Sequence, residues 1–292
     1  MNWNSRRISA ILSNALLEDQ ATHDATTLAT IDPHQRASAT ILTKEDCVLA
    51  GIGAVQRVFE VFGELEGESR TYPEVAIPQQ IFDGVHLKAG QSIASIRHNA
   101  RVLLGCERII LNLLQHLSGI ATLTAQYVDA IKGTGAAILD TRKTTPGLRM
   151  LEKYAVRSGG GFNHRLDLSD GILVKNNHID LCGGVRVAVE RAMANRKGEQ
   201  LVEVEVRNAQ ELDSALKYGA ESILLDNMTV AQTREAVARI RQEARAVRIE
   251  SSGGINLGNV RQYAETGVQF ISVGSLTHSV RAVDISMKMH AV

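Results

Sequence analysis

The chain has 292 residues, of which 44% are hydrophobic and 22% charged, and its 32 basic and 32 acidic residues balance. This composition is typical of a globular protein and provides no basic excess for binding nucleic acid or an anionic membrane surface. No apolar run is long enough to span a membrane, and residues 1–13 lack the apolar core of a secretory signal. The three cysteines are far apart and have no disulfide or metal-site spacing, which favours a cytoplasmic location: they are Cys47, Cys106 and Cys182.

The first part of the chain mixes helical and extended patterns. The predicted elements are a helix from Ile8 to Leu16, strands at 37–43 and 47–52, and a helix at 55–62. Strands mixed with a few helices are typical of α+β folds, so we predict an α+β sandwich domain over residues 1–117. A long helical pattern then runs from Glu107 to Ile131, and Gly119 predicts a bend or a close contact within it.

From Gly135 onward, short apolar runs alternate with helical patterns. The strand-like runs are 136–139, 171–174, 201–206, 222–225, 247–249 and 269–273. Strands separated by helices imply parallel βα units. A dinucleotide-binding sheet would need a glycine-rich turn after its first strand, whereas here polar residues follow nearly every strand. We therefore predict an incomplete TIM-like α/β barrel over residues 118–292, with a site assembled from several strand ends.

The segment from Asp140 to Arg149 follows the first of these strands. Arg142 and Lys143 stand between the strand end and the Pro146-Gly147 turn. Arginine offers a planar fork to a carboxylate or phosphate, and lysine offers a compact point charge. This strand end therefore predicts a binding site for an anion.

The later strand ends add further polar groups. They are His164 and Arg165 after a glycine triplet, then Lys175, Glu205, Asp226, Ser252-Gly253-Gly254, and Gly274 with His278. Each has an ordinary explanation by itself, because such lysines are often solvated, strand glutamates often form structural ion pairs, and glycine triplets are usually turns. Together on one barrel rim they predict a polyanionic substrate with a phosphate group, since unpaired buried charge is costly. Two carboxylates beside phosphates also predict a divalent cation such as Mg²⁺.

Several stretches together resemble a known family. They are ERIILNLLQHLSGIAT (107–122), ILDTRKTTPGLR (138–149), KYAVRSGGGFNHR (153–165), DGILVKNNHI (170–179), VEVEV (202–206), LLDN (224–227) and ESSGG (250–254). On these stretches the chain resembles the quinolinate phosphoribosyltransferases, the carboxylating nicotinate-nucleotide pyrophosphorylases. The resemblance implies Mg²⁺-dependent transfer of phosphoribosyl from phosphoribosyl pyrophosphate to quinolinate. Pyrophosphate leaves in this transfer. The ring's 2-carboxylate is then lost as CO₂, which gives nicotinate mononucleotide for NAD biosynthesis.

The resemblance also implies a role for each matching residue. The quinolinate carboxylates would be held by Arg142, His164, Arg165 and Lys175. The donor would be contacted by Lys143, and its 5′-phosphate would be cradled by Ser252, Gly253, Gly254, Gly274 and His278. The ribose hydroxyls and the metal would be served by Glu205 and Asp226. The catalytic set would be Lys143, Lys175, Glu205 and Asp226. Arg108, in the long helix, would complete the site of a partner subunit in a homodimer or a larger assembly.

Two positions depart from the family pattern. Asn176 stands where the family often has an acid, and Asp167 stands where it usually has a small residue.

Three other functions are alternatives to this one. One is a related phosphoribosyltransferase with another acceptor such as nicotinate, which would need fewer cations. A second is a barrel aldolase that forms a Schiff base on Lys175. A third is a non-catalytic anion sensor on the same scaffold.

Overall fold

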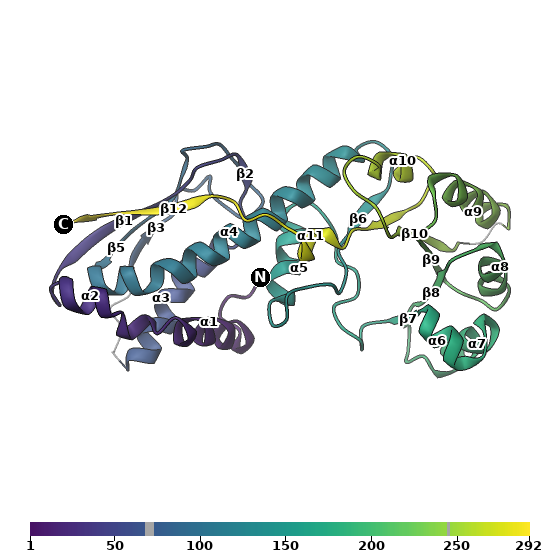
Figure 1. The fold of residues 1–292 in the computed structure, drawn as a ribbon, viewed down its shortest axis with the longest axis horizontal. Helices are drawn as coiled ribbons and strands as arrows, with labels where there is room; N and C mark the ends of the chain where they lie inside the picture. The colour runs from purple at the N-terminus through teal and green to yellow at the C-terminus, as the bar shows by residue number, and fades with distance from the viewer. Residues whose placement is uncertain (68–72, 244–245) are drawn as a thin grey trace. The chain divides into compact units, whose positions relative to one another are not determined.

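The structure is a computed structural model that describes residues 1–67, 73–243 and 246–292 (Figure 1). Contacts between residues divide the chain into two compact units. The first unit comprises Met1–Leu123, Thr145–Gly160 and Ser279–Val292, and the second comprises Thr124–Thr144 and Gly161–His278. Each unit is therefore assembled from more than one stretch of sequence.

The first unit is built on a four-stranded antiparallel sheet with the strand order β12-β1-β5-β3. Its strands are β1 (Arg36–Thr43), β3 (Glu74–Ala76), β5 (Ser92–Asn99) and β12 (Ile285–Ala291). Helices α1 (Arg6–Glu18) and α3 (Gly53–Glu66) pack against each other and bury apolar side chains. The α+β character predicted for the N-terminal part is therefore confirmed.

Several short elements complete the first unit. They are the 3₁₀-helix η1 (Ala21–His23), α2 (Ala25–Thr30), β2 (Cys47–Val48), β4 (His86–Leu87) and α5 (Arg149–Ser158). The strand predicted over 47–52 was too long. Only β2 pairs, with β4, and Gly51 has a φ of 98°, which turns the backbone out of the extended conformation.

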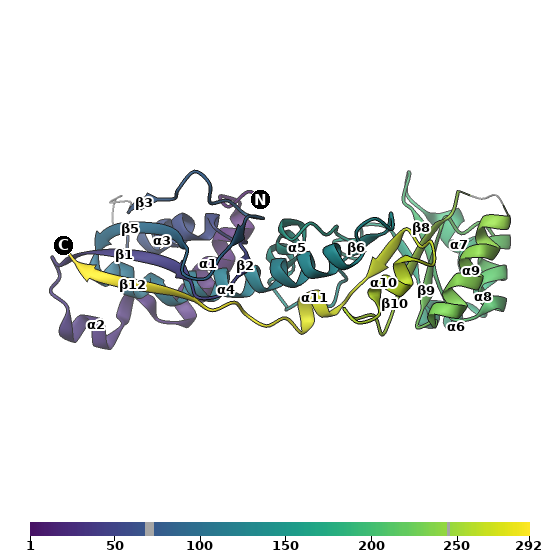
Figure 2. The same ribbon diagram turned by 90° about the horizontal axis from the view of Figure 1, so that it is seen from above.

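The C-terminal strand belongs to the first unit, which differs from the division of the chain at residue 118. Strand β12 pairs with β1, with Met289 opposite Ala39 and Ile285 opposite Thr43. Figures 1 and 2 both show this yellow strand beside β1. A strand's partner at such a separation in sequence is set by tertiary packing, so the pattern of the C-terminal residues alone did not reveal it.

Helix α4 (Ala100–Ala130) begins in the first unit and ends in the second. It starts earlier than the predicted 107–131 pattern. A Cβ on Gly119 would overlap the carbonyl oxygen of Arg281, so the close contact predicted at this glycine is confirmed.

The second unit is a six-stranded parallel sheet with the strand order β6-β11-β10-β9-β8-β7. Its strands are β6 (Ala137–Leu139), β7 (Ile172–Val174), β8 (Val202–Val206), β9 (Ser222–Asp226), β10 (Arg248–Ser252) and β11 (Phe270–Ser272). Its helices are α6 (Asn176–Cys182), α7 (Val185–Asn195), α8 (Ala209–Lys217), α9 (Val230–Gln242), α10 (Val260–Ala264) and α11 (Ser275–His278). Figure 1 shows α7, α8 and α9 side by side along these strands.

The strand order is that of an open barrel. From β7 to β11 each strand pairs with the next in the chain, and β6 lies beyond β11. A closed barrel would also pair β6 with β7, and no such ladder occurs among the described strands. The incomplete TIM-like barrel is thus confirmed, and it brings the C-terminal ends of all six strands to one edge.

Strand β8 explains how charge enters the interior of this unit. All five of its residues are buried, as expected for a parallel strand covered on both faces. Glu203 and Glu205 alternate with valines, so both project from the same face of the strand. Both line cavities of the second unit, which identifies that face as the barrel interior.

None of the helices among the described residues combines the length and apolar character needed to cross a membrane.

Candidate active site

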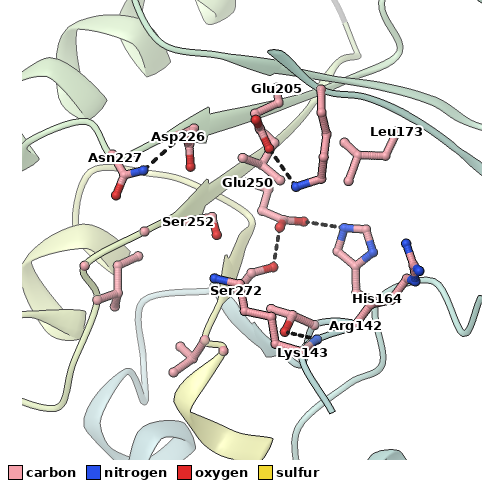
Figure 3. Close-up of a pocket in the computed structure, with 18 of the residues that line it drawn as sticks. Arg142, Lys143, His164, Leu173, Glu205, Asp226, Asn227, Glu250, Ser252 and Ser272 are labelled. Carbon is pink, nitrogen blue, oxygen red and sulfur yellow. Dashed lines mark hydrogen bonds and ion pairs between the residues drawn. The ribbon is translucent and has the colours of Figure 1, made fainter. Parts of the chain in front are cut away.

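A cavity of about 610 Å³ lies at the C-terminal ends of the strands of the second unit (Figure 3). With the exception of Arg108, it is lined by every residue predicted to form the site. These residues are Arg142, Lys143, His164, Arg165, Lys175, Glu205, Asp226, Ser252, Gly253, Gly254, Gly274 and His278. The parallel arrangement of strands brings them together, because each follows or ends a different strand.

The residues before His164 form an added extended segment beside β6. Phe162 donates its N–H to Ile138 O at 2.8 Å and accepts the N–H of Asp140 at 3.1 Å. Asp140 is fully buried, and its carboxylate accepts the backbone N–H of His164 at 2.9 Å and the side-chain amide of Asn163. This carboxylate therefore fixes the point at which the chain turns into the cavity. Asp140 was not predicted as a site residue, and it is not part of the cavity lining.

Two arginines of the cavity lack carboxylate partners. The Nε atom of Arg142 is buried without a hydrogen-bond partner. Neither Arg142 nor Arg165 forms an ion pair within the described residues. Burial and the positive charge of Arg142 lower the pKa of the Arg165 guanidinium. Buried donors and neighbouring like charges are unfavourable without an anion, so this part of the cavity is suited to bind one.

Two carboxylates of the cavity, on β8 and β9, have different hydrogen-bond partners. Glu205 is buried and accepts Lys175 Nζ at 2.9 Å. Asp226, at the end of β9, is half-buried and accepts the side-chain amide of Asn227 at 3.0 Å. Figure 3 shows both acids on the same side of the cavity. Their oxygens are the type of ligand that Mg²⁺ prefers.

The turns after β9 and β10 fit closely together. Asn227 has a φ of 53°, which is uncommon for a residue with a side chain, and its N–H binds Ser252 O at 2.8 Å. Gly253 has a φ of 93°, and a Cβ at this position would overlap the Asn227 amide. Among the described residues, the N–H groups of Gly253 and Gly254 donate to no backbone carbonyl. They are therefore available to bind phosphate oxygens.

The loop that carries Lys143 is attached to the segment after β11. Thr277 is buried and donates its hydroxyl to Lys143 O at 2.7 Å. A Cβ on Gly274 would lie 3.1 Å from His278 Nε2 and 3.3 Å from Lys143 Cδ. The absence of a side chain at Gly274 thus allows Lys143 and His278 to approach the same point. Thr277 was missed because its hydroxyl acts on a residue far away in sequence.

Glu250 and Ser272 also line the cavity and were not predicted as site residues. The predicted strand ended at Ile249, whereas β10 continues to Ser252 and therefore places Glu250 inside the barrel. Glu250 is 2% exposed and accepts the Ser272 hydroxyl. Burial, followed by the negative charge of Glu203, raises the pKa of Glu250 to about 8. An acid within an otherwise buried strand was the signal available in the sequence.

Within the described residues, metal-type side chains converge most closely at a different place from the predicted pair. Possible ligand atoms of His164, Glu203 and Glu250 lie within 4.8 Å of one another. Glu205 and Asp226 line the cavity without belonging to such a group. Two protein carboxylates suit a Mg²⁺ ion that keeps its other positions for water and substrate oxygens.

The two departures from the family pattern lie outside the cavity lining. Asp167 is exposed and accepts the backbone N–H and hydroxyl of Ser169 at 2.9 and 2.6 Å. Asn176 is the first residue of α6, where its side chain accepts the N–H of Asn177 at 2.8 Å. Neither side chain therefore belongs to the cavity lining.

Arg108 is the one predicted site residue in the other unit. It is exposed on α4 and borders a surface hollow with Asp19, His23 and Glu107. Its exposure is compatible with contact to another molecule.

Comparisons with known proteins agree along nearly the whole chain. The family descriptions that match are "Quinolinate phosphoribosyl transferase, N-terminal domain" over residues 24–118 and "C-terminal domain" over residues 120–288. The carboxylating nicotinate-nucleotide pyrophosphorylase of Mycobacterium leprae is 45% identical over 267 residues, covering 91% of both chains. The probable enzyme of that name from Bacillus subtilis is 39% identical over 284 residues, covering 97% of this chain and 94% of that one. The crystal structure of NadC from Streptococcus pyogenes superimposes with a TM-score of 0.88 at 41% identity, covering 98% and 97% of the two chains. With both domains matched and relatives of this identity along its length, the chain belongs to the quinolinate phosphoribosyl transferase family.

Proposed function

We propose that this protein transfers the phosphoribosyl group of phosphoribosyl pyrophosphate to the ring nitrogen of quinolinate. The products are nicotinate mononucleotide, pyrophosphate and CO₂, as in the de novo synthesis of NAD. Membership of the family and the names of the relatives support this reaction. A cytoplasmic location remains a prediction from the sequence.

The observation that carries the proposal is the pair of arginines without carboxylate partners. Arg142 and Arg165 both line the cavity, close enough for the charge of Arg142 to lower the pKa of Arg165, and Arg142 Nε is buried without a hydrogen-bond partner. Lys175 also lines this cavity and is paired with a single carboxylate, Glu205. Quinolinate has two adjacent carboxylates and matches such a group of cations better than the monocarboxylate nicotinate does.

Other residues of the cavity suit the phosphorylated donor. The Gly253-Gly254 turn offers backbone N–H groups to the 5′-phosphate, and Lys143 offers a point charge to the donor. Glu205 and Asp226 would bind ribose hydroxyls and stabilise the positive charge that develops on the ribose as pyrophosphate leaves. We further propose Mg²⁺ as cofactor, with carboxylate ligation by these two acids. When bound, Mg²⁺ would neutralise charge on the pyrophosphate group.

Decarboxylation would then follow without a covalent enzyme intermediate. Once the ring nitrogen carries the ribose, it is a quaternary pyridinium. The C–C bond to the 2-carboxylate breaks, its electron pair stays on the ring carbon, and a proton replaces CO₂ there. The protein would contribute mainly positioning and electrostatic stabilisation.

A direct assay of pyrophosphate release tests the proposal. Purified protein with phosphoribosyl pyrophosphate, Mg²⁺ and quinolinate should release pyrophosphate and CO₂ in equal amounts. Arg142→Ala should lose most of this activity, whereas Arg191→Ala, at an exposed position of α7, should retain it. Equal turnover of nicotinate would instead support the related enzyme with another acceptor. No release with either acid would leave the anion sensor.

The Schiff-base rival is disfavoured by the surroundings of Lys175. Its Nζ lies 2.9 Å from Glu205 Oε2, and its side chain is 47% exposed. The amine is therefore engaged by a carboxylate at a half-exposed position, whereas a Schiff-base lysine needs a dry or cationic setting. Borohydride with a carbonyl substrate should therefore trap no adduct.

We also propose a homodimer, or a larger assembly, in which Arg108 completes the site of the partner subunit. This proposal is supported by the resemblance to the family and by the exposure of Arg108 on α4. Arg108→Ala and Lys143→Ala should each be inactive. Heterodimers of the two variants, isolated with different tags, should recover activity because one of their two sites is intact. Inactive heterodimers would refute the shared site.

A further inference from the structure

Both ring nitrogens of His164 are engaged inside the second unit. Nδ1 faces the backbone N–H of Arg165 at 2.7 Å, which is a donor, so Nδ1 must be the acceptor. The ring proton is therefore on Nε2, which lies 3.0 Å from Glu203 Oε2 and 3.5 Å from Glu250 Oε2. Figure 3 shows the His164 ring beside Glu250, with a dashed line between the two side chains. The ring is thus bound through its two polar atoms before any substrate arrives.

The two glutamates that face this ring are themselves held. Glu203 Oε1 accepts the Ser222 hydroxyl at 2.8 Å, and Glu250 accepts the Ser272 hydroxyl. The two acids are 6% and 2% exposed, so solvent does not replace these contacts. One N–H group faces two carboxyl groups, and the shorter distance identifies Glu203 as its acceptor. Glu250 completes the packing around the pair.

We propose that Glu203 is a positioning residue for the acceptor subsite: with Glu250 packed beside it, Glu203 holds His164 as its Nε2–H tautomer and thereby aims Arg165 into the cavity. The link to Arg165 is direct, because the backbone N–H of that residue binds the Nδ1 atom that Glu203 keeps unprotonated. His164 then contributes orientation, and the positive charge for the acceptor comes from Arg142, Arg165 and Lys175. The kinetic consequences of this inference rest on the proposed function. The tautomer of His164 rests on geometry alone.

The two glutamates should differ in their sensitivity to removal of charge. Glu203→Gln replaces the acceptor of the His164 N–H by an amide that also presents hydrogens. Glu250→Gln replaces a buried group whose carboxyl oxygen lies 3.5 Å from Nε2, farther away than the Glu203 oxygen at 3.0 Å. Loss of the Glu203 interaction should therefore have the larger effect.

The test combines kinetics with NMR of the imidazole. Glu203→Gln should raise the KM for quinolinate by about tenfold or more, as expected for a lost hydrogen bond to a charged group, and change the KM for the donor by less than about twofold. In wild-type protein labelled with ¹⁵N-histidine, His164 should show one protonated and one unprotonated ring nitrogen. The signals of His164 are identified by their loss in the His164→Asn variant. Glu203→Gln should move both shifts toward values averaged over the two tautomers. Glu250→Gln should change KM by less than about threefold.

Further variants keep the test decisive. Ser222→Ala removes only the hydroxyl that holds Glu203, so it should shift KM and the His164 signals in the same direction by a smaller amount. Glu265→Gln, on the exposed end of α10, is the matched control and should change neither readout. Unchanged His164 signals in both Glu203→Gln and Ser222→Ala would overturn the inference. A larger loss in Glu250→Gln than in Glu203→Gln would overturn it as well.

The NMR readout needs no substrate, so it separates this inference from the proposed function. If the wild type failed to turn over quinolinate, the reaction would be refuted. The state of His164 would still be decided by its ring nitrogen shifts.

Discussion

Replacing Glu250 by glutamine should change how the stability of the protein depends on pH. Glu250 is 2% exposed, and burial together with the charge of Glu203 raises its pKa from 4.5 to about 8. Between these two values the folded state binds a proton that the unfolded state releases. The free energy of unfolding of the wild type therefore falls as pH rises through this window, and the favourable contribution is complete only below pH 4.5.

The raised pKa sets an upper limit for the effect. Each unit of pKa difference corresponds to about 1.4 kcal/mol, so the shift of Glu250 amounts to at most about 5 kcal/mol. A loss of a few kcal/mol is expected over this window. Glu250→Gln is neutral at every pH and removes this dependence. Its stability relative to the wild type should therefore increase as pH rises from 5 to about 8 and level off above that pH.

Urea unfolding followed by far-ultraviolet circular dichroism measures this difference. Wild type, Glu250→Gln and the exposed control Glu265→Gln should be compared at half-unit steps of pH. The wild type and the control should give parallel curves, and Glu250→Gln should gain on both as pH rises. Parallel curves for all three proteins would show that Glu250 is ionised in the folded state near neutral pH and would refute the reasoning.

Three further outcomes are expected. Gly253→Ala should raise the KM for phosphoribosyl pyrophosphate by about tenfold or more, because its Cβ would overlap the Asn227 amide. Gly254→Ala has open space around the added Cβ and should have a smaller effect in the same steady-state assay. Thr277→Val should weaken donor binding by about fivefold, which corresponds to about 1 kcal/mol for the lost hydrogen bond to Lys143 O. Thr277→Ser should restore the affinity. Equal affinities of the wild type and both variants in calorimetry would contradict this role. Removal of divalent cations with EDTA should abolish pyrophosphate release, and added Mg²⁺ should restore it; full activity after exhaustive chelation would contradict the proposed cofactor.

The sequence by itself determined the architecture of the second unit and most of its cavity. The alternation of apolar runs with helical stripes is a local signal, and each run lies close to a strand of the observed sheet. Parallel strands end at one edge by geometry, so residues that follow different strands had to meet there. Arg142, Lys175 and Asp226, which follow or end three different strands, accordingly line one cavity.

Tertiary structure alone decided which groups are buried together. Strand β12 pairs with β1 across most of the chain, and no local period identifies such a partner. Glu250 became a site residue because β10 extends past Ile249 and turns its carboxyl group toward His164. The electrostatic character of the cavity floor depends on distances between strands, which the sequence does not contain. The sequence therefore determined the anion site, and packing determined how its groups are held.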